Sequence, residues 1–373
     1  MNVPFFSVAN VLERQGALLN IYLDEIFERG DFVNGRLVGE LENAIKRYTG
    51  AAHAVAVGNA SDGLACALQA VNVGAGDEVI VPDLTFVSSA SSVVHCGARP
   101  VFADIDRETY GLDPDSVRKA ITPNTRALMI VHLFHQPAHM PELLCVAEEH
   151  GLVVIEDSAE GIGMRCNGRH VGLGGKAGVL SFFPTKTLGC LGDGGMVITD
   201  DENVAATCRE LRDHGRAPGT CIALRPGHSS RLDSIQAAVL LARLEVLDQE
   251  IVQRARLASL YKQGLAHLAH VVRVPSFVER PYATRGVWYV FVIECERRDE
   301  LAQFLADNGI VTETYYPLPL HLQPAFASYG YRVGDFPVSE FVCSRTLALP
   351  LYPDLEETDV NVVCDAISKF YEK

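Results

Sequence analysis

The chain has 373 residues, 48% of them hydrophobic, and a formal net charge of −15. This length suffices for a large domain and a smaller one, and the acidic balance without a basic run argues against nucleic acid or an anionic membrane surface as a partner. No apolar run approaches membrane-spanning length and the N-terminus does not resemble a signal peptide, so we expect a cytoplasmic protein. The ten cysteines include no C-x-x-C pair, so they predict neither a zinc site nor a redox pair.

The N-terminal third predicts two helices followed by an α/β region. Residues 9–30 have an amphipathic pattern, and apolar residues from Leu37 to Tyr48 share one face of a second helix. From residue 53 onward, short runs rich in valine and isoleucine alternate with helical segments, which is typical of a mainly parallel sheet covered on both faces. We expect seven strands, at His53–Val57, Glu78–Val81, Pro100–Ile105, Ala127–Leu133, Leu152–Ile155, Val179–Phe183 and Met196–Thr199.

Long helical patterns from Ser234 to Leu268 lead into a region with a different pattern. There we expect a strand at Trp288–Glu294, a helix at Arg298–Asn308, a strand at Ile310–Tyr315 and a terminal helix at Asp359–Phe370. The sequence therefore predicts two domains. The large α/β domain, with the N-terminal helices, covers residues 1–245, and a smaller α+β domain covers residues 246–373.

One lysine lies between an apolar segment and a glycine-rich return. Lys186 follows the run Val179–Pro184, and four glycines occur between Gly189 and Gly195. Because burial disfavours the charged amine, we expect the pKa of Lys186 to be lowered and its nitrogen to act as a nucleophile. On this stretch alone, a lysine that merely closes a turn is the alternative.

Three further stretches directly follow predicted strands. The small residues of Gly58–Leu64 open a helix, whose free N–H groups can bind a phosphate, although an ordinary helix cap has the same composition. Phe86 could stack on a planar ring or belong to the core. Asp157 ends a buried strand and needs either a cation or a donor from the next loop. In α/β sheets ligands bind beyond the carboxyl ends of the strands, and with Lys186 these parts suit pyridoxal phosphate.

These segments resemble the DegT/DnrJ/EryC1/StrS family of sugar aminotransferases over essentially the whole chain. The similar segments are G-N-A-S-D-G-L, E-D-S-A-E-G, S-F-F-P-T-K-T-L-G-C-L-G-D-G-G, Y-Y-P-L-P-L-H-L-Q-P-A-F, G-D-F-P-V-S-E and L-A-L-P-L-Y-P. The resemblance implies the fold-type I architecture of pyridoxal phosphate enzymes. That fold is a mainly parallel seven-stranded sheet flanked by helices, with a smaller C-terminal α+β domain. It also implies a homodimer with shared active sites.

The resemblance further implies roles for individual residues. Lys186 is the catalytic residue and holds the aldehyde of pyridoxal 5'-phosphate covalently, and pyridoxamine phosphate is the cofactor's other form. Asp157 pairs with the ring nitrogen. The other cofactor-binding residues are Ala60, Ser61, Phe86, Glu160, Ser181 and Ser229. The candidate substrate-binding residues are His214, Arg231, Tyr316 and His321, and no metal is expected.

Two of these positions depart from the family pattern. Glu160 stands where many members have glutamine. In Gly227–Arg231, Ser229 replaces the asparagine that reaches the cofactor phosphate from the partner subunit. A hydroxyl is shorter than an amide, so we expect a looser contact there. The alternative is that Ser229 lies in a surface loop and caps a helix beginning near Arg231.

The implied function is transfer of an amino group from an amino acid, expected to be glutamate, to a keto group on a nucleotide-linked deoxysugar. The C-terminal segments are similar to those of members acting at C3, whereas Glu160 points to C4. A 3-keto sugar is therefore favoured, and a 4-keto sugar and a cyclitol ketone stay open. Relatives that are sugar dehydratases carry histidine in place of the lysine, and a non-catalytic regulator should have lost the lysine or the aspartate. Lys186 and Asp157 argue against both alternatives.

Overall fold

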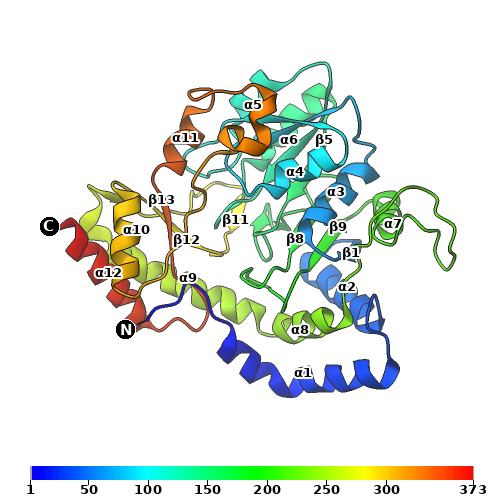
Figure 1. Ribbon diagram of the computed structural model, residues 1–373, viewed down its shortest axis with the longest axis horizontal. Coiled ribbons are helices and arrows are strands. Elements are labelled where there is room, and N and C mark those ends of the chain that lie inside the picture. Colours follow the sequence, from blue (N-terminus) through cyan, green and yellow to red (C-terminus); the bar gives the residue numbers. More distant parts are fainter. Residues whose placement is uncertain (1, 373) are drawn as a thin grey trace.

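The computed structural model describes residues 2–372, and one seven-stranded sheet forms its centre (Figure 1). Its strands are β1 (His53–Val57), β2 (Glu78–Pro82), β3 (Arg99–Ala103), β4 (Thr125–Val131), β5 (Val153–Asp157), β8 (Ala177–Ser181) and β9 (Gly195–Thr199). They lie in the order β1-β9-β8-β5-β4-β2-β3. Neighbours from β8 to β3 pair in parallel, and only β9 is antiparallel to its neighbours in this sheet. The predicted mainly parallel sheet is confirmed.

Helices cover both faces of this sheet, because its strands are apolar on both sides. One face packs against α3 (Ala60–Ala70), α4 (Ser88–His95) and α7 (Glu202–Leu211). The opposite face packs against α2 (Arg36–Thr49) and α8 (Ser234–Leu244) at one end, and against α5 (Pro114–Ala120) and α6 (Met140–His150) at the other. Helix α1 (Ala9–Arg29) lies outside these layers and contacts α8 along the lower edge of Figure 1.

The C-terminal part has its own core beside the large sheet. This core joins α9 (Leu247–Gly264), α10 (Arg298–Asp307) and α12 (Glu357–Tyr371) to a sheet of β10 (Val272–Arg273), β12 (Phe291–Cys295) and β13 (Thr346–Leu349). A third sheet contains β6 (Arg165–Cys166), β7 (Arg169–His170) and β11 (Ala283–Arg285). The remaining elements are α11 (Pro337–Cys343) and short 3₁₀ helices at Ala266–Leu268, Leu320–Leu322 and Pro324–Tyr329. None of the helices within residues 2–372 has the length and apolar character needed to cross a membrane.

One predicted strand is wrong. Segment Ile310–Tyr315 makes only isolated bridges, in which Ile310 pairs with Val3 and Glu313 with Ala348. The chain leaves the sheet there because its last residues line a cavity, and Pro317, which has no N–H donor, follows. Strand β13, which the sequence pattern did not predict, pairs with β12 instead. The proposed domain boundary at residue 245 falls between α8 and α9 and stays a prediction.

Candidate active site

A cavity of about 450 Å³ lies at the carboxyl ends of the parallel strands. Residues directly after β1, β2, β4 and β8 line it, as does the last residue of β5, and the C-terminal part closes it with Tyr289 and residues 314–316. Folding thus brings together residues that are far apart in the sequence. The predicted residues that line this cavity are Ala60, Ser61, Phe86, Asp157, Glu160, Ser181, Lys186 and Tyr316.

One end of the cavity is the N-terminus of α3. The helix begins at Ala60 with Asn59 as its cap, so the first backbone N–H groups have no partner within the helix. The Oγ atoms of Ser61 and Ser88 lie 2.7 Å apart at this end. A Cβ at Gly195 would come within 2.7 Å of the Ala60 nitrogen, so only glycine lets β9 pass this close. Free N–H groups and hydroxyls suit a phosphate dianion.

Asp157 is the last residue of β5, and only 5% of it is exposed. Its Oδ2 accepts a hydrogen bond from Ser89 Oγ at 2.7 Å, and its Oδ1 accepts one from the Ala159 N–H at 3.1 Å. Burial raises the pKa of Asp157, although these two donors and Lys186 oppose the shift. Because its hydrogen-bond donors are neutral, this buried carboxylate fits a cationic ring nitrogen as a further partner.

Lys186 lies in the loop after β8 and points at a carboxylate. Its Nζ is 3.2 Å from Glu160 Oε1 and 4.2 Å from the ring centre of Tyr289. Burial by itself would lower the pKa of Lys186, but Tyr289 and Glu160 outweigh burial and hold it above its usual value. The expected lowering of this pKa is therefore wrong for the chain by itself, because Glu160 and Tyr289 stabilise the ammonium form.

Aromatic side chains form another wall of the cavity. Phe86 is 56% exposed, which shows that it does not belong to the core. The ring centres of Phe86 and Tyr316 are 6.2 Å apart, and Tyr315 stacks on Tyr316 at 5.4 Å. Phe86 therefore presents a free face that can stack on a planar ring.

Four predicted residues do not line this cavity, and three of them lie in the loop between α7 and α8. Ser229 Oγ accepts a hydrogen bond from Arg231 Nη2 at 2.8 Å, and Arg231 Nη1 donates to Asp213 Oδ1 at 2.9 Å. His214 lies next to Asp213 in the same loop. Ser229 does not cap a helix, because α8 begins only at Ser234. Contacts of His214, Ser229 and Arg231 with cofactor or substrate therefore stay predictions that require a second subunit.

His321 has a different role from the predicted one. Its side chain is fully buried, and its Nδ1 lies 2.8 Å from Asp83 Oδ2. Its backbone N–H donates to the other Asp83 oxygen at 2.8 Å, and its Nε2 lies 3.3 Å from Glu340 Oε1. Because these carboxylates enclose His321, it ties the C-terminal segment to the end of β2 instead of contacting a substrate.

Ser89 and Tyr289 are among the site residues that the sequence analysis missed. Ser89 closely follows Phe86 at the start of a helix, and its hydroxyl there was a usable signal. Tyr289 gave no signal, because it lies in a stretch that reads as an ordinary strand. Its hydroxyl is 3.2 Å from Thr185 Oγ1, a contact that only the folded chain creates.

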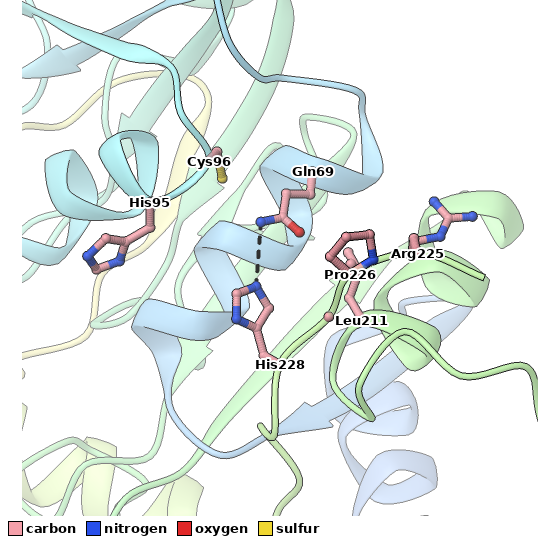
Figure 2. Close-up of a pocket in the computed structure, with 8 residues that line it drawn as sticks. Gln69, His95, Cys96, Leu211, Arg225, Pro226 and His228 are labelled. Atoms are coloured by element: carbon pink, nitrogen blue, oxygen red, sulfur yellow. Dashed lines mark hydrogen bonds between the residues drawn. The ribbon is translucent and has the colours of Figure 1, made fainter. Parts of the chain in front are cut away.

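A second cavity, of about 470 Å³, lies at the C-terminal end of α3 (Figure 2). Figure 2 shows the side chains of Gln69 and His228, which line it, pointing toward each other. Their Nε2 atoms lie 3.5 Å apart. Arg225 on its edge is already paired with Glu210 at 2.9 Å. This cavity contains none of the residues predicted for the active site.

The model of the DegT/DnrJ/EryC1/StrS aminotransferase family matches residues 15–368. The chain belongs to this family. A "Pleiotropic regulatory protein" of Geobacillus stearothermophilus is 42% identical, over 100% of this chain and 99% of its own length. The dTDP-3-amino-3,4,6-trideoxy-alpha-D-glucose transaminase of Streptomyces venezuelae is 38% identical, over 100% and 97% of the two chains.

Solved structures agree with this family assignment. The crystal structure of Streptomyces venezuelae DesV has a TM-score of 0.95 and 38% identity, covering 100% of this chain and 99% of that one. The structure of ntda from Bacillus subtilis with bound cofactor PMP has a TM-score of 0.90 and 29% identity, covering 100% of this chain and 86% of that one. The predicted family, fold class, aminotransferase activity and pyridoxal phosphate cofactor are confirmed.

Proposed function

We propose that this aminotransferase moves an amino group from glutamate to the C3 keto group of a nucleotide-linked deoxysugar. The observation that carries the proposal is the meeting of Lys186, Asp157 and the N-terminus of α3 in one cavity. The Streptomyces venezuelae relative, named for a 3-amino sugar, supports the C3 position. Glu160 remains the argument for a 4-keto sugar.

The cavity residues can hold the cofactor in one orientation. When bound, pyridoxal phosphate supplies an electron sink for the bond electrons released at the carbon that loses a proton. The N–H groups of Ala60 and Ser61 would hold its phosphate, and Phe86 would stack on its ring. The carboxylate of Asp157 would pair with the protonated ring nitrogen and keep it charged, which would preserve the electron sink.

Lys186 Nζ is the group that moves the proton between carbon atoms of the reacting molecules. It must first lose a proton and change from ammonium to free amine before it can act as a nucleophile or accept a proton. Glu160 Oε1 is 3.2 Å away, and burial raises the pKa of this carboxyl, while Lys186 opposes the shift. Glu160 can therefore take up the proton that Lys186 loses, so that the pair stays neutral as a whole.

We infer that a second copy of the chain completes the site. Phe86 and Phe183 line the cavity with exposed apolar side chains, and Leu191 is exposed in the glycine-rich return. Ile222 and Leu224 are exposed in the loop that leads to Ser229. Exposed apolar side chains on these segments indicate surfaces that another protein covers, and this supports a homodimer.

A panel of ketones tests the acceptor. Protein loaded with pyridoxamine phosphate is mixed with dTDP- and UDP-linked 3-keto sugars, the 4-keto isomers and a cyclitol ketone. We expect the absorbance of the pyridoxal form to return with a 3-keto sugar. If the absorbance returns only with a 4-keto sugar, the reaction takes place at C4. If it returns only with the cyclitol ketone, the cyclitol is the substrate. If it returns with none of these ketones, the sugar assignment is contradicted.

The reverse measurement tests the donor. Protein loaded with pyridoxal phosphate is mixed with glutamate, glutamine, aspartate or alanine, and the loss of the pyridoxal absorbance is followed. We expect the fastest loss with glutamate. No loss with any of these amino acids would instead support a regulatory role, as the name of the 42% identical relative suggests for that protein.

A further inference from the structure

Three charged side chains are buried behind the lysine loop. Arg243 on α8 is 2% exposed, Glu250 on α9 is 5% exposed, and Arg254 on α9 is completely buried. Arg243 Nη2 lies 3.1 Å from Glu250 Oε2. Burial lowers the pKa of Arg254 to about 10, although Glu250 opposes this shift. Such burial is unfavourable unless hydrogen bonds compensate for the lost water.

The compensation within this cluster is incomplete. Among residues 2–372, Arg243 Nε, Glu250 Oε1 and two nitrogen atoms of Arg254 have no hydrogen-bond partner. Apolar side chains of similar size would fill the same space without this penalty, so stability alone does not account for three buried charges. The atoms that these arginines do bind give a better account.

Both arginines bind backbone carbonyl groups next to the active site. Arg243 Nη1 donates to the Gly189 carbonyl at 2.6 Å, and its Nη2 donates to the Thr187 carbonyl at 3.3 Å. Thr187 directly follows Lys186. Arg254 Nη1 donates to the Tyr289 carbonyl at 3.1 Å and to the Leu351 carbonyl at 2.8 Å. Neither arginine lines the cavity.

Two of these carbonyl-bearing segments, the lysine loop and the segment with Tyr289, carry side chains that meet in the cavity. Lys186 Nζ lies over the ring of Tyr289, with 4.2 Å to the ring centre. We propose that Arg243, which pairs with Glu250, and Arg254, which lies within the influence of the same carboxylate, are positioning residues that hold Lys186 over Tyr289. Arg243 binds two carbonyls of the lysine loop through two nitrogen atoms of its planar guanidinium, which fixes distance and direction together better than an ammonium group can. Arg254 joins the carbonyls of Tyr289 and Leu351 through one nitrogen. The inference rests on the proposed role of Lys186.

The first test uses the protein without its cofactor and follows hydrogen–deuterium exchange. Arg243→Met should raise the exchange rate of the Lys186 and Cys190 amides, which donate to Phe183 and Phe182, by about tenfold. Arg298→Met is the matched control, because Arg298 is also buried and donates to two carbonyls, those of Cys343 and Thr346. We expect no change in the lysine loop of this control.

The second test follows attachment of pyridoxal phosphate to Lys186 by visible absorbance, and locates it by borohydride reduction and peptide mass spectrometry. Attachment should be about tenfold slower or more in Arg243→Met and in Arg254→Met than in Arg298→Met. If a methionine variant does not fold, Arg243→Lys and Arg254→Lys should show smaller changes in the same direction. Exchange and attachment rates equal to those of the control would overturn the proposal.

These measurements separate this inference from the proposed function. If no keto sugar and no amino donor reacts, the proposed function is contradicted. The exchange rates of the cofactor-free protein still decide whether the arginines position Lys186. Normal turnover with unchanged exchange in Arg243→Met contradicts the positioning role alone.

Discussion

Two buried carboxylates share the cavity, but their partners differ. Asp157 accepts hydrogen bonds from the neutral donors Ser89 and Ala159, whereas Glu160 pairs with the ammonium of Lys186. Burial raises the pKa of both carboxyl groups. A bound cation would therefore lower the pKa of Asp157 most directly, because Glu160 already has a charged neighbour.

Asp157→Asn should preserve the fold and slow proton abstraction strongly. Loss of one partner of a buried ion pair costs about 3–5 kcal/mol of interaction free energy. An activation free energy raised by this amount slows proton abstraction more than a hundredfold. Ser89→Ala removes only a hydrogen-bond donor to Asp157. It should raise the activation free energy by about 1.5 kcal/mol, which slows proton abstraction roughly tenfold. The measurement is the half-reaction rate with glutamate, and a rate close to wild type in Asp157→Asn would remove this residue from the mechanism.

Lys186→Ala should lose the cofactor's visible absorbance and both half-reactions, because no other amine pairs with Glu160 in the cavity lining. Lys176→Ala is the control, since Lys176 is exposed and pairs with Asp201 at 3.0 Å. Absorbance and turnover are measured for both. Turnover of a ketone by purified Lys186→Ala would show that the assignment is wrong.

Between elements, the contact of His321 with Asp83 joins the C-terminal segment to β2. Burial alone would lower the pKa of His321, but its hydrogen bond to Asp83 and the charges of Asp83 and Glu340 raise the pKa above 6.5. A raised pKa means that the folded chain favours the protonated form. His321 then stabilises the fold fully below pH 6.5, and this contribution is lost as the pH rises through the pKa of the folded state.

The free energy of unfolding should therefore fall as the pH rises from 6.5, by about 1.4 kcal/mol for each unit by which folding raises this pKa. His321→Asn should lack this slope, and the exposed His270→Asn should keep it. Denaturant titrations at several pH values measure the effect. Equal slopes in wild type and His321→Asn would show that the link does not titrate in this range.

The sheet could be predicted because each of its strands is a short apolar run that interrupts the helical periodicity of the sequence. The irregular segment at Ile310–Tyr315 could not, because an apolar pattern does not reveal that the chain turns away to line a cavity. The positions of Lys186 and Asp157 in one cavity could be predicted from motifs at strand ends. The burial of His321 depends on Asp83, 238 residues away, and such contacts leave no local signal.

For the whole molecule, the main open prediction is a homodimer whose subunits share the two active sites. Within one chain, the loop with Ser229 and Arg231 is held by Asp213 and does not line its own cavity. Exposed Ile222 and Leu224 precede it. The loop is thus available to reach the cavity of a second copy.

Ser229→Ala should weaken cofactor binding and make the dimer dissociate more readily when the cofactor is removed. Ser229→Asn should tighten cofactor binding by about 1.5–3 kcal/mol at best, because an amide reaches further than a hydroxyl. Cofactor affinity and sedimentation are measured on the same samples. A stable monomer that binds pyridoxal phosphate normally would refute the shared site.

The first residues of the chain depend on a segment synthesised much later. The Val3 N–H donates to the Gly309 carbonyl at 2.8 Å, and the Val311 N–H donates to the Val3 carbonyl at 3.0 Å. Val3 is 1% exposed in the C-terminal core, and Figure 1 shows the N-terminus beside the C-terminal elements. On the ribosome the segment around Val3 must wait for most of the polypeptide to emerge, and an expression fragment ending at residue 245 would leave its backbone groups without these hydrogen-bond partners.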